Sequence, residues 1–336
     1  MAEEKKKVEE TKTMADVQKA MKKKYDNLSF EKAEKSLFAN IEAIPTGCFS
    51  LDRIFGCGGM PVGRIIEMAG MESSGKTTLA LFLIAQLQKA GHKAMFIDAE
   101  HSFSNKYAQA IGVNTKELYL ITPDIGEEIF DVMQNTIDTG EVKLIVVDSV
   151  ASILPGREEK SEIDKDNVAA QARLITKGLQ RITGRAARNK TTILFINQVR
   201  QGIGGYMPTE TTPGGKALKF YASVRFRISG KKIEEDKSTI GNTMTIFAKK
   251  NKVANPHKTA TLDVYFSKGV DIYGDILDCA EIEGIVVRAG ATYSFVSGCC
   301  EERLGVGRDK ARKFLEDNKE ICEIIRKQLE DIYKVT

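Results

Sequence analysis

A short loop rich in glycine and hydroxyl residues has the clearest potential for chemistry. Residues 70–78 read Gly-Met-Glu-Ser-Ser-Gly-Lys-Thr-Thr, which fits the P-loop pattern GxxxxGK[ST]. In such a loop, backbone N–H groups surround phosphate oxygens, and the N-terminus of the next helix adds a favourable field. Lys76 would reach the β- and γ-phosphates, and the Thr77 hydroxyl would ligate Mg²⁺. The predicted ATP-binding residues are Gly70, Met71, Glu72, Ser73, Ser74, Gly75, Lys76, Thr77 and Thr78.

The segments on either side of this loop have the properties that a P-loop needs. The apolar run 64–69 predicts a buried strand, and residues 77–89 predict a helix. A P-loop lies between a strand and a helix in this order. The alternative, a Gly-Ser turn before a core helix, is disfavoured because the strand, loop, Lys-Thr pair and helix all occur in sequence.

Polar side chains end three further predicted strands. Glu100 follows strand 93–99 and is a candidate for activating the water that attacks the γ-phosphate, although a capping or exposed glutamate would also fit. Asp148 ends the apolar strand 143–147 in a Walker B arrangement, which holds Mg²⁺ beside Thr77. Gln198, after strand 192–196, could sense the γ-phosphate. We expect these groups to meet because the carboxyl ends of parallel strands share one edge of a sheet.

The segment 199–215 has a different composition from the rest of the chain. It contains five glycines and two prolines, which predicts a long loop without regular structure. Such loops inside a compact domain are usually functional. It begins beside Gln198 and carries Arg200, with Lys216 and Lys219 just beyond it. These features favour a nucleic-acid-binding element whose order depends on the nucleotide.

Residues 14–25 predict an amphipathic helix. Met14, Val17 and Met21 recur at helical spacing, and lysines fill the other side. The apolar stripe could pack on its own domain or on another subunit. Periodicity does not separate these options, and in an average protein the intramolecular one is commoner.

The composition is that of an ordinary cytosolic protein of 336 residues with a net charge of +4. We expect no membrane segment, no signal peptide and no metal site built on the three histidines. The six cysteines show no ligand spacing and are expected to be reduced thiols. Adjacent Cys299 and Cys300 could be a redox device, although a pair without function is commoner.

The predicted fold class is α/β with a mostly parallel central sheet. We divide the chain into an N-terminal helical segment (1–39), an ATPase and nucleic-acid-binding core (40–274) and a small α+β domain (275–336). Late strands are predicted at 224–229, 242–249 and 259–266. In the last domain we expect strands at 285–287 and 293–296 and helices at 309–316 and 319–333.

From about residue 40 to about 333 the chain resembles bacterial RecA recombinases. The resemblance rests on the P-loop, on Phe-Ile-Asp-Ala-Glu-His at 96–101, on Val-Val-Asp-Ser-Val-Ala at 146–151 and on Phe-Ile-Asn-Gln at 195–198. Residues 217–225 (Ala-Leu-Lys-Phe-Tyr-Ala-Ser-Val-Arg) and Lys-Asn-Lys at 250–252 are also similar to the family. The resemblance implies a RecA-type P-loop core, with ATP and Mg²⁺ as cofactors. It also implies a helical filament on single-stranded DNA that pairs and exchanges strands with double-stranded DNA in the cytosol of a bacterium, or of the host if phage-encoded.

The resemblance implies a role for individual residues. Glu100 would be the general base, Gln198 the nucleotide sensor and Tyr107 the residue near adenine. Lys250 and Lys252 would reach the ATP of the neighbouring subunit. The interface residues would be Lys219, Phe220, Met14, Val17 and Met21, which makes the N-terminal helix a subunit-docking element.

The resemblance also implies two DNA loops, at residues 158–167 and 199–213. The expected DNA-binding residues are Arg173, Arg200, Gln201, Gly202, Ile203, Gly204, Gly205, Tyr206, Met207, Thr211, Thr212, Gly214 and Gly215. The first loop reads Glu-Lys-Ser-Glu where the family usually has Glu-Gly-Glu, and the second is one residue shorter than in well-known members. The chain stops without the acidic tail that is common in the family. We therefore expect that the restraint such a tail places on the access of duplex DNA is absent or weaker. The family further implies a LexA-type repressor as a partner.

Two other functions compete with a strand-exchanging ATPase. A hexameric RecA-core motor is disfavoured by the lysine pair, the long loop after Gln198 and the C-terminal domain. A non-enzymatic ATP switch is disfavoured by Glu100, which indicates turnover.

Overall fold

The computed structural model describes residues 13–25, 30–32, 41–156, 167–201, 210–236, 238–266, 268–297 and 300–333. The chain separates into two units, Met1–Ile41 and Glu42–Thr336. The first holds helix α1 (Met14–Lys24), which begins with a reciprocal capping box between Thr13 and Asp16 and contains no buried residue. The predicted helix at 14–25 is therefore confirmed. On its apolar side Met14 is exposed, and Val17 and Met21 are half-buried.

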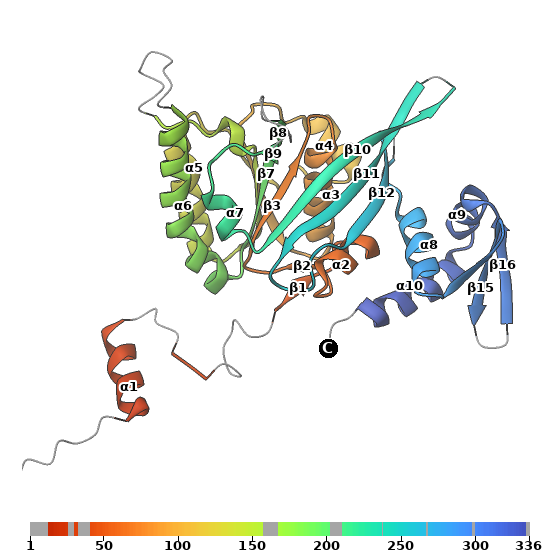
Figure 1. The fold of residues 1–336 in the computed structure, drawn as a ribbon, viewed down its shortest axis with the longest axis horizontal. Coiled ribbons are helices and arrows are strands. Elements are labelled where there is room, and N and C mark those ends of the chain that lie inside the picture. Colours follow the sequence, from red (N-terminus) through yellow and green to blue (C-terminus); the bar gives the residue numbers. More distant parts are fainter. Residues whose placement is uncertain are drawn as a thin grey trace, which may run out of the picture. The chain divides into compact units, whose positions relative to one another are not determined.

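A nine-stranded sheet forms the centre of the second unit (Figure 1). Its strand order is β13-β12-β11-β10-β3-β7-β6-β4-β5. Neighbouring strands are parallel from β10 to β5 and antiparallel from β10 to β13. The strands are β3 (Ile65–Gly70), β4 (Lys93–Asp98), β5 (Tyr119–Ile121), β6 (Val142–Asp148), β7 (Thr192–Gln198), β10 (Val224–Glu235), β11 (Ser238–Asn251), β12 (Thr259–Tyr265) and β13 (Gly269–Val270). The predicted mostly parallel α/β sheet is confirmed.

Helices cover both faces of this sheet, and the strand sequences explain why. Along β6, Leu144 and Val146 belong to the core beneath α3, whereas Ile145 and Val147 belong to the core beneath α5 and α6. Successive side chains of a strand point to opposite faces, so a strand covered on both sides is apolar throughout. The helices of this part are α2 (Phe49–Phe55), α3 (Lys76–Lys89), α4 (Asn105–Ile111), α5 (Gly126–Thr139), α6 (Asn167–Asn189) and α7 (Ala217–Tyr221), with the short 3₁₀ helix η2 (Val150–Ser152) and strands β1 (Ala43–Ile44) and β2 (Met60–Pro61).

The C-terminal part has its own core around a three-stranded antiparallel sheet, β14-β15-β16. Its elements are α8 (Ile272–Ile282), β14 (Val286–Ala289), β15 (Thr292–Ser297), β16 (Cys300–Val306), α9 (Arg308–Asp317) and α10 (Lys319–Tyr333). Strand β16 was not predicted. Leu304 is its buried apolar residue, and the flanking Glu301, Glu302 and Arg303 are exposed, so no alternation marks the strand.

Two predictions about the region after β7 need correction. The segment 199–215 was expected to lack regular structure, but β8 (Arg200–Gln201) pairs antiparallel with β9 (Glu210–Thr211). Such short ladders leave no periodicity in the sequence. The hairpin β10–β11 is also longer than predicted, because residues 231–235, which are charged and exposed except for the half-buried Ile233, continue the ladder. No helix within the described ranges is long and apolar enough to span a membrane.

Candidate nucleotide-binding site

The P-loop joins β3 to α3, and two of its glycines are required by close approach. Gly75 has a φ of +87°, and a Cβ there would lie 2.3 Å from Sδ of Met244. A Cβ on Gly70 would lie 2.5 Å from Oγ of Ser74 and 2.6 Å from the Ile228 carbonyl oxygen. Because β10 runs directly beside β3, only glycine lets the loop turn this tightly.

The interior of the P-loop is equipped to receive an anion. The Lys76 ammonium is buried and donates to the Met71 carbonyl oxygen at 2.7 Å. Burial lowers the pKa of Lys76, while the carboxylates of Asp148 and Glu100 act in the opposite direction. The hydroxyl oxygen of Ser74 is buried and has no hydrogen-bond partner among the described residues. Among the described residues, the Lys76 ammonium donates to a loop carbonyl, and the Ser74 hydroxyl has no partner. Both groups fit a site for phosphate groups.

Thr77 and Asp148 lie beside this loop as a Mg²⁺ site would require. The Thr77 hydroxyl donates to Asp148 Oδ2 at 2.6 Å. Burial raises the pKa of Asp148 to about 6, against the lowering effect of the Thr77 hydrogen bond. Within the described ranges there is no cluster of three or more His, Cys, Asp or Glu residues that could hold a metal ion alone. A hydroxyl and one carboxylate suit Mg²⁺, which keeps several water ligands and also binds phosphate oxygens.

Glu100, Ser149 and Gln198 meet at the ends of three neighbouring strands. Glu100 Oε1 accepts hydrogen bonds from the Ser149 hydroxyl and, at 3.2 Å, from Gln198 Nε2. The turn that carries Glu100 is held by Asp98, whose carboxylate accepts from the backbone N–H groups of Ser102 and Phe103. An exposed carboxylate held by an amide sensor can orient a water and respond to what the amide contacts. Ser149 was not predicted, although it directly follows the Walker B aspartate.

Two cleft residues come from parts of the chain that the sequence did not link to the P-loop. A cleft of about 340 Å³ is lined by Ser73, Gly75, Lys76, Thr77 and Thr78 together with Asn242 and Phe266. Phe266 follows β12 and is 51% exposed. Tyr107, predicted near adenine, forms a 2.6 Å hydrogen bond with the Thr78 hydroxyl. The sequence alone did not link Phe266 to the phosphate site, because the link depends on β10, β11 and β12 following β3 in the same sheet.

Two buried polar side chains connect the sensor strand to β10. Asn197 donates to Glu67 Oε1 at 3.0 Å and to the Pro213 carbonyl oxygen at 3.2 Å. The other carboxylate oxygen of Glu67, which is 1% exposed, pairs with Arg225 Nε. Asn197, next to Gln198, therefore contacts both the central sheet and the end of segment 199–215. One signal for this network was present in the sequence: Glu67 is a charged residue inside a strand that is predicted to be buried.

The predicted lysine pair lies at the end of β11, and Asn251 between the lysines anchors it. Asn251 is buried and donates to the carbonyl oxygens of Ile54 and Phe55. Lys250 Nζ donates to the carbonyl oxygens of Lys219 at 2.7 Å and Phe220 at 3.1 Å. Burial lowers the pKa of Lys250, and Lys252 and Arg225 act in the same direction. Lys252 and Phe220 are exposed, the latter 71%.

The expected DNA-binding residues fall into three groups. Those at 202–207, and the loop at 158–166, lie outside the described residues. Arg173, Arg200 and Thr211 are exposed, on α6, β8 and β9, and the same group includes Gln201 of β8 and the half-buried Thr212 after β9. Gly214 and Gly215 pass closely over α6, since a Cβ on Gly215 would lie 2.8 Å from the Ala172 Cβ. DNA contact by these residues stays a prediction.

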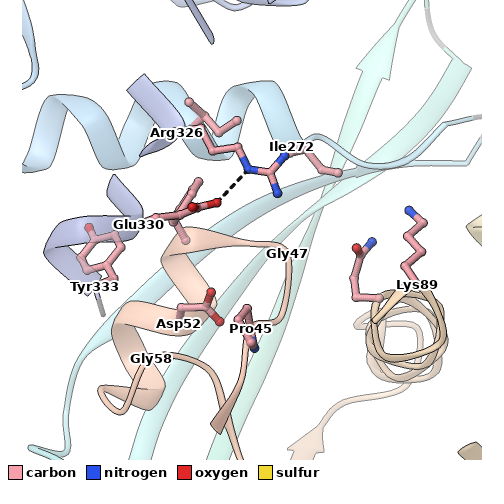
Figure 2. A pocket seen from close by; sticks show the side chains of 12 residues that line it. Pro45, Gly47, Asp52, Gly58, Lys89, Ile272, Arg326, Glu330 and Tyr333 are labelled. Carbon is pink, nitrogen blue, oxygen red and sulfur yellow. Dashed lines mark hydrogen bonds and ion pairs between the residues drawn. The ribbon is translucent and has the colours of Figure 1, made fainter. Parts of the chain in front are cut away.

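A larger cavity, of about 520 Å³, lies away from the P-loop (Figure 2). Asp52 of α2, Lys89 at the end of α3, and Glu330 and Tyr333 of α10 line it. In Figure 2 the Arg326–Glu330 ion pair closes one side of it, with Arg326 Nε 3.2 Å from Glu330 Oε1. The cavity does not hold the predicted catalytic groups, so its size does not mark it as the nucleotide site.

A P-loop on a mostly parallel sheet, with a carboxylate and an amide at neighbouring strand ends, defines a nucleotide-binding protein of the P-loop class. Comparison with known proteins narrows this class. Residues 12–271 match the RecA N-terminal domain, and residues 274–334 match the RecA C-terminal domain.

Three relatives illustrate the similarity over the whole chain. Protein RecA of Fusobacterium nucleatum is 41% identical over 322 residues, covering 95% of this chain and 84% of the relative. Protein RecA of Bacillus subtilis is 40% identical, with coverage of 94% and 90%. Protein RecA of Solidesulfovibrio magneticus is 42% identical, with coverage of 93% and 87%. The chain therefore belongs to the RecA family, and is a recombinase of homologous pairing and DNA repair.

Proposed function

We propose that the protein assembles as a helical filament on single-stranded DNA and couples strand exchange to ATP hydrolysis. The observation that carries this proposal is the meeting of Glu100, Ser149 and Gln198 beside the Lys76–Thr77–Asp148 group. This meeting supports the assignment of Glu100 as the base, Gln198 as the sensor and the P-loop as the phosphate-binding loop of one site.

In this mechanism each residue has a separate task. Lys76 and the P-loop amides bind the triphosphate, and Thr77 and Asp148 hold Mg²⁺. Mg²⁺, when bound, neutralises charge that develops on the phosphate oxygens. Glu100 orients the attacking water and accepts its proton. Gln198 and Asn197 connect the occupied site to segment 199–215, because Asn197 bonds the Pro213 carbonyl oxygen.

Subunit assembly is supported by groups that are exposed within one chain. Phe220 is 71% exposed, and Met14 on α1 is 68% exposed. At the edge of the large sheet, Tyr119 and Leu120 of β5 are 46% and 42% exposed. Apolar side chains and an open strand edge are costly in water and favour contact with another chain. Lys250 and Lys252 would then reach the neighbour's ATP, so that two subunits complete one site.

Electron microscopy together with a strand-exchange assay tests the proposal. With single-stranded DNA and ATP we expect extended helical filaments and transfer of a labelled strand from a homologous duplex. Closed rings that unwind duplex DNA would instead support the hexameric motor. The bacterial or host cytosol as its location, and a LexA-type repressor as its partner, belong to the same proposal. Faster repressor self-cleavage with the filament than with free protein would support the partner.

A further inference from the structure

A small basic pocket lies on the sheet face opposite α3, beside the end of segment 199–215. It has a volume of about 50 Å³, and Thr212, Lys219, Arg225, Arg227 and Lys249 contribute to its wall. None of the described residues that line it is acidic. A space of this size holds a small polyatomic anion and excludes a nucleoside.

The strand pattern directs two arginines to this face. On β10, Val224, Phe226 and Ile228 are buried in the core under α3, so Arg225 and Arg227 point to the other side. Arg225 sits opposite Glu67 in the register of β10 and β3 and pairs with it. Arg227 donates from Nη1 to the Ile228 carbonyl oxygen at 3.1 Å.

Lys249 reaches the pocket through an irregularity in β11. Arg225 is opposite Lys250, but Phe226 is opposite Ala248, so Lys249 is an extra residue in the ladder. A β-bulge of this kind changes the direction of a side chain. Lys219 of α7 completes the group of four cations. Arg225 pairs with Glu67, and Arg227 also takes part in interactions within the chain.

A second observation points to a missing hydrogen-bond partner. The hydroxyl oxygen of Thr212 is buried, lines this pocket and has no hydrogen-bond partner among the described residues. A buried hydroxyl without a partner is costly, and a bound acceptor would satisfy it. Four cations and one available hydroxyl around a small space suit the oxygens of a single phosphate group.

We propose that this pocket binds one phosphate oxyanion, and that the sugar-phosphate backbone of single-stranded DNA supplies it. Thr212 and Val199, at the two ends of the predicted DNA segment, both line the pocket, which favours DNA over the nucleotide as the source. The inference rests on the proposed function and adds to it: Arg227 and Lys249 become DNA-positioning residues at the base of segment 199–213. Phosphates bound there would hold the DNA close to Asn197 and the sensor.

The test compares Arg227→Gln/Lys249→Gln with the control Lys319→Gln/Lys327→Gln, which removes two exposed lysines of α10. Binding to labelled oligo-dT is measured in the full-length protein with a non-hydrolysable ATP analogue over a range of salt. We expect about tenfold weaker binding and a salt slope lower by about 0.7, the value for one phosphate contact on single strands. The control should bind like the wild type. Circular dichroism establishes that each variant is folded.

Thr212→Val separates this role from folding. Without DNA it should be as stable as the wild type or more so, because the unpartnered hydroxyl is gone. Its affinity for oligo-dT should nevertheless fall several-fold. Binding of a fluorescent ATP analogue without DNA is the second arm. If the variants bound the ATP analogue more weakly but bound oligo-dT like the wild type, the phosphate pocket would be confirmed and DNA would be rejected as the source of the phosphate.

The inference would be overturned if Arg227→Gln/Lys249→Gln and Thr212→Val both bound oligo-dT and the ATP analogue with wild-type affinity. The salt slope of their oligo-dT binding would then also equal that of the wild type. That failure differs from failure of the proposed function, in which the wild-type protein itself would not bind oligo-dT.

Discussion

Lys76 and Glu100 lie in the same site but act on different steps, and single substitutions distinguish them. Lys76→Ala removes the buried ammonium that bonds the Met71 carbonyl oxygen, so ATP binding should be lost. Glu100→Gln keeps a side chain of the same shape beside Ser149 and Gln198. It should bind ATP normally and hydrolyse it about 10²–10⁴-fold more slowly, the usual contribution of a general base. Equilibrium binding of a fluorescent ATP analogue and single-turnover hydrolysis measure the two steps.

A matched control is Glu117→Gln, which removes an exposed carboxylate outside the P-loop and outside the predicted site. It should hydrolyse ATP within a few-fold of the wild type. Wild-type turnover by Glu100→Gln would show that Glu100 is not the base.

A buried carboxylate outside the site predicts how stability changes with pH. Burial raises the pKa of Asp52 to about 7 from 3.8, although hydrogen bonds from Thr46 lower it. The folded state thus holds this proton more tightly than the unfolded state. The free energy of unfolding should fall as the pH rises from about 4 through about 7, by roughly 4 kcal/mol at about 1.4 kcal/mol per pKa unit.

Asp52→Asn should remove this loss. Both hydrogen bonds from Thr46 go to Oδ1, at 2.9 and 2.7 Å, so an asparagine oxygen can accept them. The variant should gain stability relative to the wild type at pH 8 and much less at pH 5, as measured by urea unfolding. Asp317→Asn, on the exposed end of α9, should show no such difference between the two pH values. A constant offset for Asp52→Asn at both pH values would contradict a titrating Asp52.

At the scale of elements, the contact between α5 and α6 depends on a missing side chain. Gly178 of α6 lies against Phe130 of α5, and a Cβ there would be 2.3 Å from the Phe130 ring. Gly178→Ala should therefore force the helices apart and lower the free energy of unfolding by about 1–3 kcal/mol, the usual cost of overpacking. Thermal or urea unfolding measures the change.

The same helix offers the control. Gly184 is exposed, and a Cβ there would meet only the flexible Arg188 side chain at 3.4 Å. Gly184→Ala should stabilise the protein by about 0.5–1 kcal/mol, because alanine loses less backbone entropy in a helix. If both substitutions changed the free energy of unfolding in the same direction, packing against Phe130 would not explain the effect of Gly178→Ala.

At the scale of the whole assembly, the predicted site is shared between subunits. Lys250 donates to the carbonyl oxygens of Lys219 and of the exposed Phe220, and it does not line the P-loop cleft of its own chain. Lysines that act on the neighbour's ATP would stabilise transition-state charge and contribute on the order of a thousandfold to hydrolysis. Exposed surface lysines would contribute little.

Mixing two inactive proteins tests the shared site. Lys250→Ala/Lys252→Ala and Glu100→Gln should each be nearly inactive, although both bind nucleotide. At a mixed interface, the Glu100→Gln subunit can supply its lysines to a partner with an intact Glu100. DNA-stimulated ATPase activity should then reappear, as measured by phosphate release. A mixture that forms mixed filaments and stays inactive would reject the shared site.

Local patterns were sufficient for the P-loop, for Asp148 and for most helices and strands. Glycine spacing, strands that are apolar throughout and the amphipathic pattern of α6 and α10 are properties of neighbouring residues, and they do not depend on distant packing. The meeting of Glu100 and Gln198 was also predictable, because parallel strands end at the same edge. Strand β16 and the β8–β9 pair were missed because neither has an alternating apolar pattern.

Tertiary structure alone decided which distant segments complete the sites. Asn242 and Phe266 line the P-loop cleft only because β11 and β12 add antiparallel strands beyond β10 in the sheet that contains β3. Glu67 pairs with Arg225 through strand register, and Lys249 joins the basic pocket through a bulge. Register and bulges depend on hydrogen bonding between strands that are far apart in the chain. The local sequence therefore carries the chemistry of the loop, whereas the order of the strands determines which side chains surround it.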